Sequence, residues 1–435
     1  MASRTRIISQ SKAVYVSPTG ALGNLTPAGK VLTGVMPQQL HRVDTFSFDI
    51  DIAGGRQDIR EFGQLARIGT ITLGDLNPSF SLGYYLGEGE NEGNLGFNGL
   101  GVTGNAGGTA SVMRDQFISG IIGEDPAKRE KNLFVLTVKE GADAFASTSS
   151  FIDNPTGRFS TAERAGHDVV SLGNCNFENY SLNFAVGEIP RVDIDGTAEN
   201  LTFDTTSSGL YNPSLNKAGG RADTGQFMLG TPSTGNMDVL VLRPEDVTLS
   251  FSRSNNFAFG GTSLGDMHVQ SASIEVPLSR TPIEALGSAK AVAKPLDFPI
   301  NVTMSVSALL KNFAEGQIDK ILTGSAGSET TDIILKVKGE DGKNKHHYVM
   351  KKAVMDSQGF SQGLDDNETI DLVFSTQIGG TNQKEQGFFY SGEKANQKDV
   401  YSVDAATAQQ NFDDGFLYAK KNDLDPYSSE DGAGS

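Results

Sequence analysis

Residues 56–86 read RQDIREFGQLARIGTITLGDLNPSFSLGYYL, and residues 280–310 read RTPIEALGSAKAVAKPLDFPINVTMSVSALL. Each stretch opens with Arg-x-x-Ile and has a glycine four positions after the isoleucine: Arg56, Ile59 and Gly63 in the first, Arg280, Ile283 and Gly287 in the second. The two copies align at an offset of 224 residues without a gap from His41 to Leu86, and eight of these 46 positions are identical. This pattern indicates an internal duplication of a β-domain.

Alternating apolar and polar residues flank the motif in both copies. Phe46, Phe48 and Ile50 alternate with serine and aspartate before the first motif, and Ile274 and Val276 alternate with serine and glutamate before the second. The pattern is typical of strands with one buried and one polar face, and a slip of one residue would exchange the faces. An ordinary solvent-facing sheet alternates in the same way, but this polar face lacks Lys and Arg in both copies. The residues that we place on it are Asp49, Asp51, Ser79, Ser81, Ser273, Glu275, Thr303 and Ser305.

The repeat divides the chain into two domains. We expect the first domain over residues 1–204, a linker over 205–236, the second domain over 237–380 and a C-terminal extension over 381–435. Helical spacing of apolar residues indicates one helix per domain, near residues 114–122 and 311–322. The expected fold class is mainly β with one helix per domain (α+β), built as two tandem β-sandwich or half-barrel domains. Scattered aromatic residues in the extension indicate that part of it packs on a neighbour.

A glycine-rich insertion lengthens the first copy over about residues 87–112. It includes Gly87, Gly89, Gly93 and Gly96. No Gly-Lys-Ser/Thr sequence ends the run, and no strand-to-helix context surrounds it, which argues against a phosphate-binding loop. We expect a long projecting loop that becomes ordered on contact with another chain.

Composition and charge argue against several classes of protein. The net charge of −17 argues against a protein that holds nucleic acid through its phosphates. No apolar run approaches the ~18 residues that a membrane span needs, and we expect no secretory signal. The single cysteine, Cys175, excludes an internal disulfide framework and favours assembly in a reducing compartment.

No constellation of catalytic residues occurs in the sequence. The five histidines belong to no His-Glu-x-x-His motif, and Cys175 has no neighbouring base of a known motif. Asp193-x-Asp195-Gly196 has the spacing of the start of a calcium loop, but the remaining ligands are missing, which favours a strand that ends in a turn. We therefore expect no enzymatic activity, no metal and no cofactor.

The repeated strand, Arg-x-x-Ile turn and return strand resemble the major tail tube proteins of long-tailed bacteriophages. The segment from Asp297 to Thr303, DFPINVT, carries much of this resemblance. It implies two tail-tube-like domains per chain, with three chains forming a pseudo-sixfold ring and rings stacking into a tube through which genomic DNA passes into the host. The polar-face residues would then line the channel. The glycines of the insertion would lie in a loop between subunits.

The resemblance also implies a location and partners. The chain would lie in the virion tail after assembly in the host cytoplasm. Its partners would be other copies of itself, the tape measure, tail terminator and distal tail proteins, and double-stranded DNA in transit without sequence-specific binding, but no membrane.

Two alternatives stay open at this point. A baseplate or distal-tail ring component would form a single ring instead of a polymer. A bacterial surface β-protein or adhesin is also glycine-rich, acidic and β, but it would need a signal peptide, which we do not expect here.

Overall fold

The computed structural model shows a mainly β chain, with two short helices in the part that it describes. The described residues are 12–18, 37–51, 56–72, 77–87, 89–97, 116–122, 129–138, 167–205, 208–216, 218–221, 226–229, 247–252, 268–288, 290–309, 330–339, 344–361, 369–379 and 386–392.

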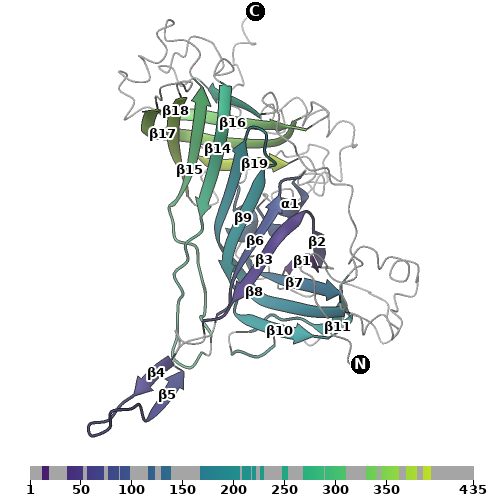
Figure 1. Cartoon of the computed structure of the whole chain (residues 1–435), viewed down its shortest axis with the longest axis vertical. Helices are drawn as coiled ribbons and strands as arrows, with labels where there is room; N and C mark the ends of the chain where they lie inside the picture. The colour runs from purple at the N-terminus through teal and green to yellow at the C-terminus, as the bar shows by residue number, and fades with distance from the viewer. Residues whose placement is uncertain are drawn as a thin grey trace, which may run out of the picture.

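Seven strands of the N-terminal half form one connected set. They are β1 (Lys12–Pro18), β3 (Val43–Asp49), β6 (Ser79–Tyr85), β7 (Lys131–Val138), β8 (His167–Ala185), β9 (Arg191–Thr197) and β10 (Asn200–Asp204). Neighbouring strands pair in the order β1-β7-β8-β9-β6-β3, and β10 pairs with β8. Every one of these pairings is antiparallel, and this set occupies the lower half of Figure 1.

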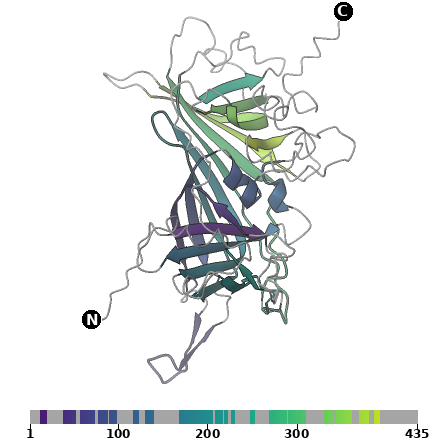
Figure 2. The ribbon, with the colours of Figure 1, turned by 90° about the vertical axis from the view of Figure 1, so that its right-hand side faces the viewer.

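Seven strands of the C-terminal half form a second set with the same order of pairing. They are β13 (Val247–Ser252), β14 (His268–Pro277), β15 (Ile300–Leu309), β16 (Thr331–Lys338), β17 (Asn344–Ser361), β18 (Thr369–Ile378) and β19 (Gly387–Gly392). The order is β13-β16-β17-β18-β15-β14, with β19 beside β17. This set occupies the upper half of Figures 1 and 2, and β14 joins it to β8 of the first set.

The remaining elements are short. They are β2 (Gln38–Leu40), β4 (Arg56–Ile59), β5 (Gly69–Thr72), α1 (Glu90–Leu95), α2 (Ser119–Ile122), β11 (Ser208–Tyr211) and β12 (Gln226–Met228). The helix expected near residues 114–122 corresponds to α2, which is a single turn. The second expected helix, over 311–322, lies outside the described residues.

The long strands β8 and β17 each belong to two sheets. Asn174 in β8 and Lys352 in β17 have positive φ values, 53° and 50°, which bend each strand. In β8, residues before the bend pair with β7 and β10, and residues after it pair with β9 and β14. A shift of register follows each bend, between Phe177 and Asn179 in β8 and between Met355 and Ser357 in β17. Each set therefore consists of two sheets that share one bent strand.

The gapless alignment at an offset of 224 is wrong by two residues in the strand before the motif. Directly after a bulge, Thr45 pairs with Gly83 in the first set and Ser271 pairs with Ser307 in the second. Gly83 and Ser307 are 224 residues apart, as aligned, whereas Thr45 and Ser271 are 226 apart. The predicted assignment of side chains to the two faces of the strand was still correct, because a shift of two residues keeps every side chain on its own face.

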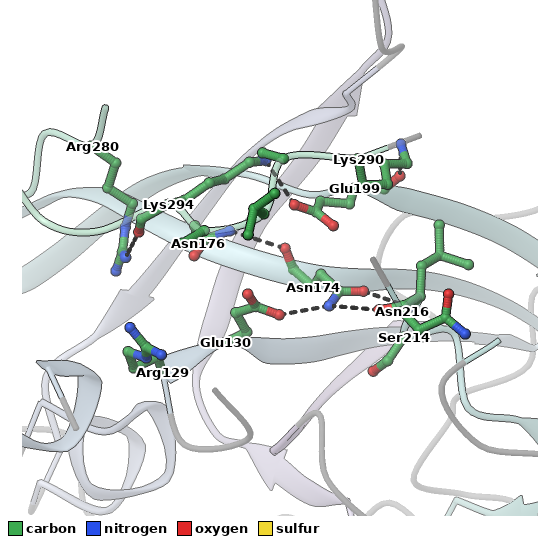
Figure 3. Close-up of a pocket in the computed structure, with 14 residues that line it drawn as sticks. Arg129, Glu130, Asn174, Asn176, Glu199, Ser214, Asn216, Arg280, Lys290 and Lys294 are labelled. Carbon is green, nitrogen blue, oxygen red and sulfur yellow. Dashed lines mark hydrogen bonds and ion pairs between the residues drawn. The ribbon is translucent and has the colours of Figure 1, made fainter. Parts of the chain in front are cut away.

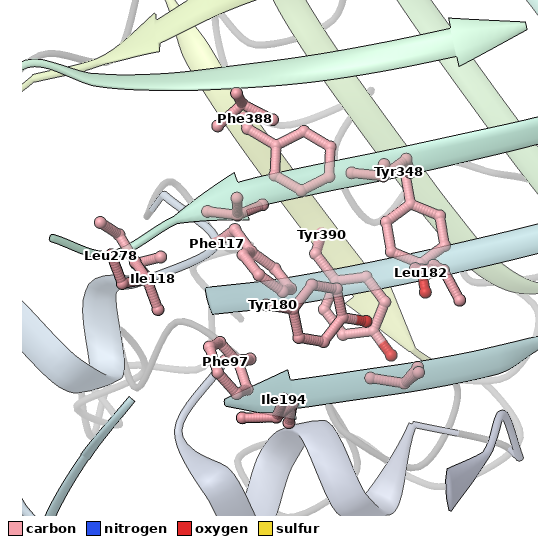
Figure 4. Packing of buried hydrophobic residues seen from close by; sticks show 14 of the residues in the cluster. Phe97, Phe117, Ile118, Tyr180, Leu182, Ile194, Leu278, Tyr348, Phe388 and Tyr390 are labelled. Carbon is pink, nitrogen blue, oxygen red and sulfur yellow. The ribbon is translucent and has the colours of Figure 1, made fainter. Parts of the chain in front are cut away.

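One hydrophobic core extends through both sets. Phe117, from the segment before α2, packs against Tyr180 of β8 and against Phe388 and Tyr390 of β19, with ring centroids 4.9–5.7 Å apart (Figure 4). All four side chains are fully buried. Phe388 and Tyr390 belong to the expected C-terminal extension, yet they pack in the core of their own chain, because β19 pairs with β17. Packing of another part of the extension on a neighbour stays a prediction.

The segment expected to be a linker also contributes to the core. Leu210 on β11, Phe227 on β12 and Leu229 are buried in a cluster with Tyr15 and Phe134. The rings of Phe134 and Phe227 meet edge to face at 5.1 Å. Part of residues 205–236 therefore covers the outer side of the first set.

Candidate functional site

An extended polar surface covers one face of an eight-stranded sheet. This sheet runs β3-β6-β9-β8-β14-β15-β18-β17, so it crosses both sets of strands without interruption. One row of residues in register across it is Thr45, Gly83, Asp193, Ser181, Glu275, Thr303 and Ser375. We call this side of the sheet, which carries the exposed and half-buried residues of the alternating strands, the polar face.

Seven of the eight residues expected on a polar face lie on this one surface. Asp49 is opposite Ser79, Ser81 belongs to the next row, Glu275 is opposite Thr303 and Ser273 is opposite Ser305. All seven side chains are exposed or half-buried, and their neighbours along each strand point into the core or toward it. The eighth, Asp51, follows the end of β3 and is exposed. In the observed register Glu275 takes the place of Asp49, so both sets have a carboxylate opposite a hydroxyl at this point.

Arg191 is the single Lys or Arg among the residues that the ladders of this sheet pair in register. Its guanidinium forms ion pairs with Asp44 at 2.9 Å and Asp193 at 3.0 Å, and it donates a hydrogen bond to Thr45 Oγ1 at 2.9 Å. The group lies over Gly83, where an added Cβ would stand 2.5 Å from Nη2. Two carboxylates thus neutralise the one cation and hold it against the sheet.

Carboxylates dominate the charge of this surface. Asp49, Asp195, Glu275 and Asp371 are all exposed on it. Asp195 lies within β9 beside the ion-paired Asp193, so the Asp-x-Asp-Gly sequence forms a strand.

The repeated motifs form two matching hairpin tips. Gly63 and Gly287 sit in the turns with φ values of 97° and 85°, which a residue with a side chain adopts only at a cost. Behind the turn, Ile68 N donates to Ile59 O at 2.9 Å, and Val292 N donates to Ile283 O at 2.8 Å. Each tip exposes an apolar side chain completely, Phe62 in the first and Leu286 in the second. The first hairpin, β4–β5, projects from the lower end of the molecule in Figure 1.

The two arginines of the motif lie at the start of their hairpins. Arg56 is the first residue of β4. Arg280 donates from Nη1 to Lys294 O at 2.8 Å and from Nε to Phe177 O at 3.5 Å, so it ties the second hairpin to the first set of strands.

The glycines of the insertion do not form a projecting loop where the structure describes them. Gly89 and Gly96 cap the two ends of α1 in left-handed conformations, and Gly93 lies within this helix. The physical reason is that Leu95 and Phe97, between and after these glycines, bury their side chains in the core. Gly87 is buried as well, and His346 Nε2 lies within hydrogen-bond distance of its carbonyl oxygen. A contact of this segment with another chain stays a prediction for the remainder of the insertion, which lies outside the described residues.

A polar pocket of about 420 Å³ lies where the second hairpin rests on the first set (Figure 3). Lys294 forms a nearly buried ion pair with Glu199 at 3.0 Å, and Lys290 donates to the backbone oxygen of Glu199 at 3.1 Å. On the opposite wall Asn174 donates to Glu130 at 2.6 Å. The two lysine contacts join the two sets of strands, and we assign the pocket to that packing.

Buried titratable groups do not form a reactive site in the described part of the chain. Burial lowers the pKa of His346 from 6.5 to about 4 and that of His347 to about 3, so neither is poised as a base near neutral pH. Burial also raises the pKa of the Cys175 thiol far above its usual range, which makes it inert. Among the described residues, no three His, Cys, Asp or Glu side chains are grouped to hold a metal ion. No helix in the same ranges is long and apolar enough to cross a membrane.

Comparison with known proteins leaves the family open. No family model and no curated protein matches the chain. Among solved structures, it is similar to a chain of the virion of a native gene transfer agent particle, with 8% identity over 35% of this chain and 100% of that chain and a TM-score of 0.22. A chain of the tail of an empty gene transfer agent particle matches with 10% identity over 32% and 96%, at a TM-score of 0.22. A chain of the anti-feeding prophage baseplate matches with 12% identity over 31% and 91%, at a TM-score of 0.23. At TM-scores of this size we draw no conclusion about function from these matches.

Proposed function

We propose that the chain is a structural subunit of a phage-type tail tube and that its two sets of strands are tandem copies of one tube domain. The observation that carries the proposal is the polar face, which runs unbroken over eight strands from both sets. Its one cation among the residues paired in the sheet, Arg191, is neutralised by Asp44 and Asp193. The identical order of pairing in the two sets supports the duplication, as do the matching bends at Asn174 and Lys352.

A wall of carboxylates and hydroxyls suits a channel for DNA. Duplex DNA carries one negative charge per ~1.7 Å, so lysines repeated along a tube would hold it by releasing counterions. Carboxylates do not bind it, and at physiological salt their repulsion is screened over ~8 Å, which keeps the duplex off the wall without blocking entry. Arg191 does not oppose this role, because Asp44 and Asp193 already neutralise it.

The two copies also account for a ring. Edge strands expose unpaired backbone groups, and a closed ring of subunits pairs all of them. Three chains would give six tube domains and a pseudo-sixfold ring, and rings would stack into the tube. In this role the protein belongs to the virion tail, assembles with other copies and other tail proteins, and performs no catalysis.

The test replaces Asp49, Asp51 and Glu275 with Lys together. These side chains are exposed outside the core, so each chain should still fold, while DNA ejection from the particles that assemble should slow or stall. Raised salt should partly restore ejection because it screens the new contacts. The matched control carries Asn, Asn and Gln at the same positions. It removes the negative charges without adding positive ones, and it should eject DNA at nearly the normal rate.

Two results would count against this function. Unchanged ejection of the Lys variant at low salt would mean that the polar face is not the DNA path. Particles with a single ring of this protein and no polymer would instead favour a baseplate or distal-tail component.

A further inference from the structure

Within the chain, the two sets meet along one antiparallel ladder between β8 and β14. Seven residue pairs form it, from Ser271 opposite Ala185 to Pro277 opposite Asn179. Two backbone hydrogen bonds extend it at its ends, from Val186 N to Gln270 O at 2.9 Å and from Leu278 N to Glu178 O at 2.7 Å. This contact joins β8, the bent strand of the first set, to β14, the strand before the motif in the second set.

The counterparts of these two strands are edges of the sheet. β3 occupies the position of β14, and among the described residues it pairs only with β6. The second half of β17 occupies the position of the second half of β8, and residues 354–361 pair only with β18 in the same ranges. Within the described residues, the two edges of the sheet are therefore the counterparts of the two strands that already pair inside the chain.

Apolar side chains along the free β3 edge are exposed where their counterparts are buried. Phe48 is 38% exposed, whereas Ile274 at the same register position of β14 is 0% exposed. Phe203 of β10 is 68% exposed and its ring lies 6.4 Å from that of Phe48, whereas Tyr390 at the same position of β19 is 1% exposed. In the second set these positions are covered by the first set, which includes Phe117 over Tyr390. The pattern of exposure matches a surface that a further copy of the second set would cover.

We propose that β3 of one chain pairs with β17 of a second copy of this chain, in the register of the internal ladder. Transferring that register residue by residue places Asp49 opposite Gly359 and Asp51 opposite Ser357, antiparallel. The proposal rests on the proposed function and supplies its contact between subunits. It extends the polar face from chain to chain, because Asp49 and Gly359 both lie on that side.

The contact is heterologous, so each chain offers one edge of each kind and a ring can close. Its side-chain contacts differ from those inside the chain. Thr70 stands where the second hairpin has Lys294, so the ion pair with Glu199 has no counterpart between chains. Backbone pairing and the apolar residues beside it would supply the affinity.

Disulfide trapping of assembled protein tests this register. Directly opposite residues of an antiparallel pair have Cβ atoms about 4.5–5.5 Å apart, near the range of a disulfide, whereas diagonal neighbours are ~7–8 Å apart. The first variant carries Asp49→Cys and Gly359→Cys. A Cβ at Gly359 meets only Asp371 Cβ at 3.9 Å, so the substitution fits. The second carries Asp51→Cys and Ser357→Cys. The control combines Asp49→Cys with Ser357→Cys, which is out of register by two residues. The native Cys175 is buried and takes no part.

After mild oxidation, the two in-register variants should lose their monomer band to covalent dimers and trimers, while the control should remain largely monomeric. Equal or stronger linking of the control, or no linking by either in-register pair while the unsubstituted protein assembles, would overturn the register. If the unsubstituted protein forms no rings in electron micrographs, the proposed function itself fails, which distinguishes the two outcomes.

Discussion

Replacement of Glu92 by Gln should change how the stability of the chain depends on pH. Glu92 lies in α1 and is fully buried, with Oε1 accepting a hydrogen bond from the Tyr84 hydroxyl at 3.0 Å. Its other carboxyl oxygen, Oε2, has no hydrogen-bond partner among the residues that the structure describes. Burial raises the pKa of this carboxyl from 4.5 to about 7, against a smaller lowering by hydrogen bonds to its own backbone and to Tyr84.

The sign of the effect follows from proton binding. Because the pKa is higher in the folded chain, the folded state binds more protons than the unfolded state between pH 4.5 and 7. The contribution of Glu92 to the free energy of unfolding is therefore complete below about pH 4.5 and is lost as the pH rises through 7. One pKa unit corresponds to ~1.36 kcal/mol, so the loss amounts to roughly 3 kcal/mol.

Two neighbouring histidines act in the opposite direction. The lowered pKa values of His346 and His347 make their contributions to stability increase with pH up to about 6.5. The wild-type curve alone is therefore not diagnostic. The difference between wild type and the Gln variant isolates Glu92, because Gln keeps the acceptor for Tyr84 and cannot ionise.

The assay is urea unfolding of the unassembled protein at intervals from pH 4 to 8. The Gln variant should gain stability relative to wild type by about 3 kcal/mol across this range, with most of the gain between pH 5 and 7. Parallel curves for the two proteins would refute the burial of a protonated carboxyl, and with it the packing of α1 in the core.

Three further substitutions test the packing and the free edge. Phe117→Ala should lower the free energy of unfolding by ~3–5 kcal/mol, because this ring joins the segment of α2 to β8 and β19. Equilibrium unfolding measures this loss, and a loss below ~1 kcal/mol would contradict the packing role of the ring. Ile274→Ala should cost ~2–5 kcal/mol of stability, whereas Phe48→Ala at the matching position should cost roughly 1–2 kcal/mol and mainly raise the concentration needed for assembly, as measured by light scattering. Equal effects of both substitutions on folding and assembly would contradict the difference in exposure.

The sequence predicted the strands around the motif well, because their side chains report the two faces directly. Phe80, Leu82, Val302 and Met304 are buried, and the residues between them face the polar surface, as the alternation requires. The alignment of the first strand was nevertheless shifted by two residues. Apolar periodicity is blind to such a shift, since a period of two maps each face onto itself.

Other features left no local signal in the sequence. The bends at Asn174 and Lys352 occur where one strand passes from one sheet to another. Neither residue is a glycine, the residue that adopts positive φ most readily, so the sequence does not mark the bends. The sequence did not predict the helix α1, because its glycines indicated a loop. Leu95 in this helix and Phe97 after it are buried, and Phe97 packs against Tyr180 from far along the chain. β19 lies after a polar segment, and only its pairing with β17 shows why its three consecutive aromatic residues are buried.

Electron microscopy of the purified full-length protein, carried to a reconstruction, tests the central claim most directly. The tail-tube account predicts stacked rings, each built from six sets of strands, two from each of three chains as drawn in Figure 1. The polar face with Asp49 and Glu275 should point toward the lumen. A protein that stays monomeric, or a ring in which that face points outward and a cationic or apolar surface lines the lumen, would contradict it.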